Sequence, residues 1–85
     1  MNNYYRILSI KSYLKQCMYE GGSNDNINYL IDLCSYFLNE SLELNKENII
    51  DFKDELITTL DFQQNNSLLE ILPVIDKIEK ELPNV

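Results

Sequence analysis

The sequence has no histidine and no tryptophan, and its 85 residues include only two glycines, two prolines and two cysteines. So few chain-breaking residues favour long helices over many short strands. The lack of histidine, with only two cysteines, disfavours a zinc site. No apolar run approaches the ~18 residues of a membrane span, and the N-terminal MNNYYRILSIK lacks the uninterrupted apolar stretch of a signal peptide. We therefore expect a cytoplasmic protein that does not enter a membrane.

Length and composition indicate a single folded domain over residues 1–85. An apolar content of 45% is ordinary for a globular protein, despite a net charge of −7. A chain of this length buries roughly 60–65% of the surface that its unfolded form exposes, so we expect a modest margin of stability.

Negative charge is concentrated in the middle of the chain. Residues 1–20 carry a net charge of +2, residues 21–62 carry −7, and the remainder carries −2. Contacts to a phosphate backbone require Lys and Arg, so this balance disfavours direct binding of nucleic acid. It favours a basic protein partner, or simple solubility.

Apolar spacing predicts a compact all-α bundle. Residues recurring three, four and seven apart indicate helices at about 3–20, 25–40 and 46–61, and a last helical segment beginning at Asn66 or Ser67. Gly21, Gly22 and Ser23 are expected to end the first helix. Pro73 predicts a kink near residue 72 or a fresh helix, so the bundle has four helices, or five.

Side chains that cap helices and fill the core follow from the same pattern. Asn24 or Asp25 is expected to cap the second helix and Asn45 the third. The second helix is apolar around most of its circumference, which predicts a central helix or burial at a dimer interface, hence a monomer or a weak dimer. Cys17 and Cys34 lie on apolar faces and are expected to be small buried hydrophobic residues.

The third predicted helix has a core face and an acidic face. Its apolar side carries Ile49, Phe52, Leu56 and Leu60, with Ile50 and Ile57 beside them. Its other side carries Glu47, Asp51, Asp54, Glu55, Thr58 and Asp61. Glu40 and Glu43, in the preceding turn, extend this acidic face. It is either a solvated surface that keeps a small protein soluble, or an interface for a basic partner.

Catalytic chemistry finds little support in the sequence. There is no histidine, no glycine-rich phosphate loop after a strand, and no nucleophile beside an obvious base. No segment matches a twelve-residue calcium loop with its central glycine. We expect neither an enzyme nor a bound metal or cofactor. The six tyrosines are typical either of a core rim with hydroxyls in water or of an interface.

One segment resembles a known family. Residues 29–56, YLIDLCSYFLNESLELNKENIIDFKDEL, resemble the core of MafI-type immunity proteins, small helical proteins of polymorphic toxin and contact-dependent growth inhibition systems. In that pattern a leucine-rich helix with a central Leu-Cys pair and an acidic end is followed by alternating aliphatic residues and a polar-capped helix. The matching positions are Leu30, Leu33, Cys34, Leu38, Glu40, Leu42, Leu44, Lys46, Glu47, Ile50 and Leu56.

The resemblance implies a non-enzymatic inhibitor that binds a cognate toxin C-terminal domain. Many such toxins are nucleases, whose active-site clefts are basic because they hold phosphate. The acidic face would cover that cleft, with charge speeding association. The partner-binding candidates are Glu40, Glu43, Glu47, Asp51, Asp54 and Glu55.

Two other functions fit the same composition. The first is an acidic mimic of nucleic acid that inhibits a host defence protein; a neighbouring cluster of small phage genes, rather than an upstream toxin gene, would favour it. The second is a plain helical adaptor with a merely solvated acidic face, whose binding to an apolar partner would survive high salt.

Overall fold

A computed structural model describes residues 2–21, 25–63 and 66–83. The described residues form four α-helices and one 3₁₀ helix, with no strand among them, which confirms the predicted all-α bundle. The elements in chain order are α1 (Asn3–Gly21), α2 (Asp25–Leu38), α3 (Lys46–Gln63), η1 (Asn66–Ile71) and α4 (Leu72–Glu81).

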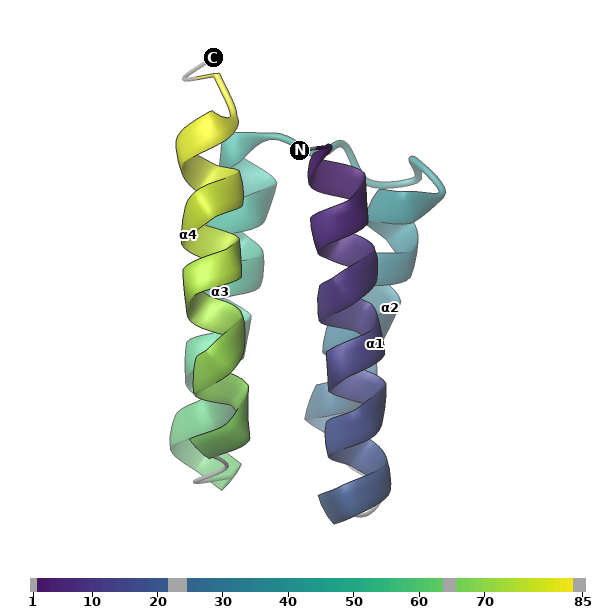
Figure 1. The fold of residues 1–85 in the computed structure, drawn as a ribbon, viewed down its shortest axis with the longest axis vertical. Coiled ribbons are helices and arrows are strands. Elements are labelled where there is room, and N and C mark those ends of the chain that lie inside the picture. Colours follow the sequence, from purple (N-terminus) through teal and green to yellow (C-terminus); the bar gives the residue numbers. More distant parts are fainter. Residues whose placement is uncertain (1, 22–24, 64–65, 84–85) are drawn as a thin grey trace.

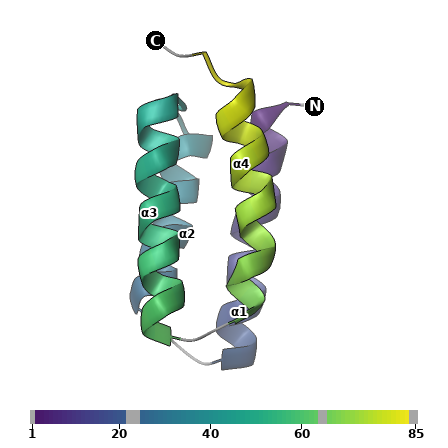
Figure 2. The same ribbon diagram turned by 90° about the vertical axis from the view of Figure 1, so that its left-hand side faces the viewer.

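The helices are arranged as two antiparallel pairs. Helices α1 and α2 form one pair and α3 and α4 the other, with the α2–α3 connection crossing between the pairs at one end (Figure 1). Turning the molecule shows α3 and α4 in front of α2 and α1 (Figure 2). Each helix therefore packs against two neighbours, as in a four-helix bundle.

The predicted helix boundaries are close to the observed ones. The Asn45 side-chain oxygen accepts the Asn48 backbone N–H at 2.8 Å, confirming the expected cap of α3. The Asn2 side chain caps α1 in the same way, through the Tyr4 N–H at 2.8 Å. Helix α1 ends at Gly21, while Gly22, Ser23 and Asn24 lie outside the described residues. Helix α2 ends at Leu38 because Asn39 and Glu40 form a turn.

Pro73 divides the last helical segment, as one of the two predicted alternatives requires. It lies in the first turn of α4, where its missing N–H costs nothing because that group has no intrahelical acceptor. The residues before it, Asn66–Ile71, form the tighter 3₁₀ helix η1 instead of continuing one α-helix. A fresh α-helix therefore starts at Leu72.

Every helix contributes one buried stripe to a single core. The buried apolar residues are Ile7, Ile10, Leu14, Cys17, Ile27, Leu30, Cys34, Phe37, Ile49, Phe52, Leu56, Leu68, Ile71, Ile75 and Ile78.

The prediction that α2 is a central helix is wrong. Among the described residues α2 packs only against α1 and α3, and Tyr29 and Tyr36 are about half exposed. Its apolar residues exceed what one packing face covers.

Both cysteines are buried. Cys34 is fully inaccessible, and burial raises the pKa of its thiol to about 12 because the thiolate would lose its hydration. A thiol in this state is a poor nucleophile. The predicted role as small buried hydrophobic residues agrees with their position.

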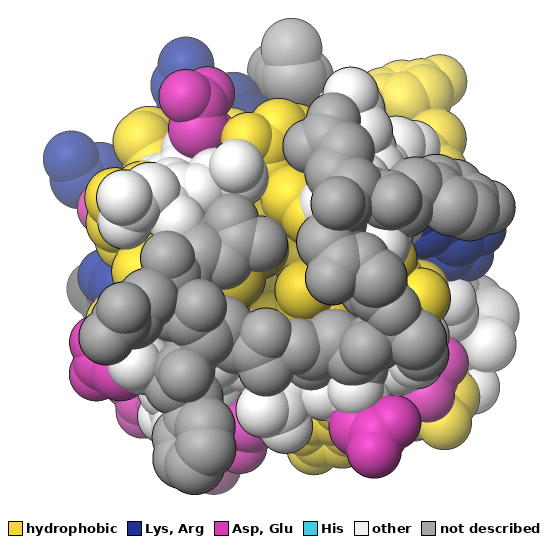
Figure 3. Space-filling model, turned by 90° about the horizontal axis from the view of Figure 1, so that it is seen from below, with side chains coloured by type: hydrophobic (Ala, Val, Ile, Leu, Met, Phe, Trp, Pro, Cys, Tyr) yellow, Lys and Arg dark blue, Asp and Glu magenta, His cyan; other side chains and the backbone are white. Residues whose placement is uncertain are grey.

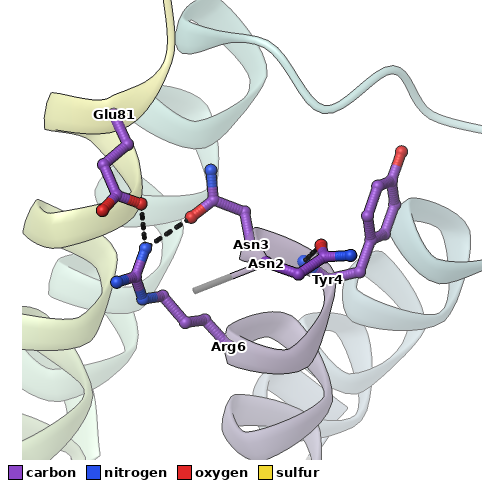
Figure 4. Close-up of polar contacts among 5 residues, drawn as sticks. All are labelled: Asn2, Asn3, Tyr4, Arg6 and Glu81. Carbon is purple, nitrogen blue, oxygen red and sulfur yellow. Dashed lines mark hydrogen bonds and ion pairs between the residues drawn. The ribbon is translucent and has the colours of Figure 1, made fainter.

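A buried arginine joins the first helix to the last. Arg6 is only 7% exposed, and its Nη1 donates to the Asn3 side chain at 2.7 Å and to the Glu81 carboxylate (Figure 4). The hydrogen bond from Arg6 to Glu81 is the main reason that the pKa of Glu81 lies below its ordinary range, and the positive charge of Arg6 lowers that pKa further. The pair ties the two chain ends together across 75 residues of sequence.

This pair predicts an acid-sensitive contribution to stability. Because the folded-state pKa of Glu81 is depressed, its contribution is present above the unfolded-chain pKa of about 4.3 and is lost as the pH falls through the lowered value. Glu81→Gln should therefore lower the urea midpoint at pH 7 but leave it unchanged in strong acid. Glu70→Gln, at an exposed carboxylate, is the control; an equal effect from both variants at pH 7 would contradict a specific role for the pair.

Candidate functional site: the acidic side of helices α2 and α3

All six predicted partner-binding carboxylates are exposed, and they lie on α3 and on the connection that precedes it. Glu40 and Glu43 belong to the connection between α2 and α3. Glu47, Asp51, Asp54 and Glu55 are exposed positions of α3, whereas its Ile49, Phe52 and Leu56 are buried. The 3.6-residue period that buries the apolar set places the carboxylates outward.

The connection between α2 and α3 is held by two hydrogen bonds that Glu43 accepts. The Asn45 Nδ2 donates to the Glu43 carboxylate at 3.0 Å, and the Asn48 Nδ2 donates to the Glu43 backbone carbonyl at 2.7 Å. Since Asn45 also caps α3, one small network fixes both the turn and the start of the acidic helix. Glu43 thus helps to order the connection as well as adding charge.

Glu40 has a left-handed backbone, with φ of 66°. It follows the end of α2, where glycine is the usual residue because it has no Cβ to clash with the neighbouring carbonyl. A glutamate here is conformationally strained, and strain of this kind is a reason to look for function nearby.

Glu40→Gly should stabilise the protein by about 0.5–1 kcal/mol. Removing the Cβ relieves about 1–2 kcal/mol of strain, partly offset by about 0.5–1 kcal/mol of extra backbone entropy in the unfolded chain. Urea denaturation followed by circular dichroism measures the change. Glu40→Ala removes the same charge but keeps the Cβ, so it should give no comparable gain; equal stabilisation by both would assign the effect to charge.

One lysine within α3 is paired away from the acidic face. Lys53, on α3, turns toward α4, where its Nζ lies 2.7 Å from Asp76 Oδ1 and 3.7 Å from Glu79 Oε1. The Asp76 hydrogen bond is the main reason that the pKa of Lys53 is raised. Among the described residues, none of the ion pairs involves the six candidate carboxylates.

The distribution of charge is seen when the bundle is viewed along its axis from one end (Figure 3). In Figure 3 most of the visible Asp and Glu side chains lie along the lower edge, on the side of α2 and α3. Lys and Arg side chains lie at the upper left and at the right. A field of one sign on one side of a small protein attracts a partner of the opposite sign.

Three of the carboxylates repeat at four-residue intervals. Glu47, Asp51 and Glu55 are at i, i+4 and i+8 on α3, so successive side chains are neighbours on the helix surface. Like charges at this spacing destabilise a helix by about 0.2–0.5 kcal/mol per pair. The repeated carboxylates therefore do not stabilise the folded protein.

A groove opens between α2 and α3 beside these carboxylates. Its volume is about 450 Å³, and its lining residues are Tyr29, Leu33, Phe37, Leu42, Asn48, Asp51, Phe52, Asp54 and Glu55. The apolar residues come from α2, the connection and α3, whereas all three carboxylates come from α3. The structure therefore brings Asp51, Asp54 and Glu55 together on the groove and leaves Glu40, Glu43 and Glu47 outside its lining.

The groove's apolar lining was missed by reasoning from the sequence. The pattern predicts a helix covered on several sides, with its tyrosines at the rim of the core or at an interface, but Tyr29, which lines the groove, is 49% exposed. The signal was the excess of apolar residues on α2. Part of that excess lines an open groove instead of contacting a further helix.

Other types of site have no counterpart in the described part of the chain. No group of three or more His, Cys, Asp or Glu side chains there is placed to hold a metal ion. No helix there has the length and apolar character needed to cross a membrane. Comparison with protein-family models, with curated proteins and with solved structures finds no match to this chain.

Proposed function

We propose that this protein is an immunity protein that binds and neutralises a cognate antibacterial toxin domain of the nuclease type. The observation that carries the proposal is the acidic side of α2 and α3, which holds exposed carboxylates beside an apolar groove and has no basic partner among the described ion pairs. The resemblance of residues 29–56 to MafI-type immunity proteins supports the same function.

The mechanism is occlusion of a basic cleft. A nuclease cleft carries positive charge because it must hold phosphates, and the acidic face is complementary to it. Charge accelerates the encounter, while exposed Tyr29 and Tyr36 and the groove supply contact area that slows dissociation. No catalytic group of the inhibitor is needed.

Growth rescue tests the proposal directly. The C-terminal ~100–150 residues of the upstream reading frame, about the size of one domain, are expressed in cells with and without this protein. We expect toxicity that this protein relieves, and a complex that co-purifies at low salt and weakens as salt rises. A catalytically inactivated toxin domain, expressed alone, is the control for toxicity unrelated to nuclease activity.

The alternatives give different results in the same experiment. A nucleic-acid mimic would give no rescue but would co-purify with a host DNA- or RNA-binding protein in a salt-sensitive complex. A helical adaptor would hold its partner at high salt. No toxicity and no complex with the upstream domain would refute the immunity function.

A further inference from the structure

The groove between α2 and α3 has two chemically different parts. Leu33, Phe37 and Leu42, with Phe52, give it an apolar floor, and Tyr29 adds an exposed aromatic ring. Asp51, Asp54 and Glu55 supply negative charge from the α3 side only. Its volume, about 450 Å³, is in the lower part of the usual range for small ligand sites, about 300–1,000 Å³.

We propose that this groove receives a single arginine side chain projecting from the protein partner. An arginine has an aliphatic stem that packs on apolar surface and a planar cation that bonds carboxylates with two N–H groups at once. Its guanidinium also stacks on aromatic rings and is less strongly hydrated than the lysine ammonium. The apolar floor, the aromatic ring and the one-sided carboxylates each match one part of that side chain.

The carboxylates of the groove are available for this contact. Lys53, the nearest lysine along α3, is occupied by Asp76 and Glu79 on the opposite side of the helix. Asn48, another lining residue, has its side-chain amide bonded to the Glu43 carbonyl at 2.7 Å. Asp51, Asp54 and Glu55 thus face the groove without an ion pair among the described residues.

The arginine's role in the partner rests on the proposed function. In a nuclease an exposed arginine of the cleft binds substrate phosphate through the same forked hydrogen bonds that a carboxylate accepts. Its capture by Asp51 and Glu55 would replace a phosphate contact with a carboxylate contact. The groove would then hold the central anchor, with the remaining carboxylates of the face acting mainly on the rate of association.

The affinity of the groove for arginine can be measured without any toxin. The ¹⁵N-labelled protein is titrated with N-acetyl-arginine methylamide and, in parallel, with the lysine and citrulline analogues. Citrulline has nearly the shape of arginine but no charge. We expect saturable shifts centred on the amides of Leu33, Asp51 and Glu55, with a Kd of about 1–10 mM for arginine, several-fold weaker binding of lysine and no saturation by citrulline.

Two variants with the same change in net charge separate the groove from the overall field. Asp51→Asn/Glu55→Gln removes two groove charges, and Asp32→Asn/Glu70→Gln removes two exposed charges outside its lining. The groove pair should weaken arginine binding at least about tenfold and the control pair less than about twofold, because exposed charges act weakly through screened solvent. Tyr29→Ala, at an exposed ring, should weaken arginine more than lysine.

The outcomes distinguish this proposal from the proposed function. Equal loss in the two double variants, equal binding of lysine and arginine, or shifts spread evenly over the acidic residues would overturn the arginine site. Saturable arginine binding without rescue of the upstream toxin would refute the immunity function and leave the groove's chemistry standing. Rescue of the upstream toxin without arginine binding would overturn the arginine site and leave the immunity function standing.

Discussion

Asp51→Lys should weaken the complex with the toxin domain about 100-fold or more, and should at the same time make the free protein more stable. A lysine at the groove faces the basic surface of the partner with like charge, which costs several kcal/mol, and each 1.4 kcal/mol corresponds to about tenfold in affinity. The two effects have opposite sign because the negative charge of Asp51 favours binding of the basic partner but destabilises α3 by repelling neighbouring carboxylates.

The gain in stability comes from the carboxylates at four-residue intervals. Asp51 lies one turn from both Glu47 and Glu55, so a lysine there turns two repulsive pairs into two attractive ones. At about 0.2–0.5 kcal/mol for each of the two pairs lost and the two pairs gained, the total is about 0.8–2 kcal/mol. Urea denaturation at low salt should show the gain, and added salt should reduce it.

Asp32→Lys is the matched control for binding. Asp32 is an exposed carboxylate on α2 that is not part of the groove lining, and its reversal changes the net charge equally. Titration calorimetry with the toxin domain should show a much smaller loss for Asp32→Lys. A similar loss from both variants would mean that net charge, and not this position, determines affinity. A less stable Asp51→Lys protein would contradict the repulsion argument.

The helices and the acidic face were predictable because both follow from local periodicity. Spacing by three and four residues places Ile49 and Phe52 inward and Asp51 outward whatever the helix packs against. The Asn45 cap is also local, since its acceptor serves an N–H only three residues away. Such features depend on a single element and its immediate neighbours in the chain.

The groove and the Arg6–Glu81 pair depend on packing between elements. The same apolar residues on α2 suit a central helix or a helix with an open side, and only the arrangement of α1 and α3 decides between them. Arg6 and Glu81 are 75 residues apart, so neither position indicates the other. Pro73 left two outcomes because a proline fixes only its own backbone and that of its neighbour.

Phe37→Ala should destabilise the protein by about 3–5 kcal/mol. Phe37 is fully buried in α2, and its ring meets that of Phe52 of α3 edge to face, with centroids 6.2 Å apart and planes at 62°. At about 0.05–0.15 kcal/mol per residue, the whole 85-residue chain has a stability of about 4–13 kcal/mol. Loss of this ring would therefore remove a large share of the total. Urea denaturation monitored by circular dichroism measures it.

A double-mutant cycle isolates the contact between the rings. Phe37→Leu and Phe52→Leu keep most of the apolar volume, so each alone should cost well below Phe37→Ala, and their combination should reveal a coupling of about 0.5–1.5 kcal/mol. No coupling, with a cost below about 1 kcal/mol for Phe37→Ala, would mean that the rings do not hold α2 and α3 together.

Phe37→Ala and Asp51→Lys should both reduce binding, the first mainly through loss of folded protein and the second through the charge at the groove. Phe37 lines the groove from beneath as well as joining its two walls, so its truncation should reduce binding by depleting the folded protein and by opening the floor. Binding lost through unfolding should recover partly when an osmolyte such as sucrose stabilises the folded variant. Binding lost through Asp51→Lys should not recover, because that protein is already folded and carries the wrong charge.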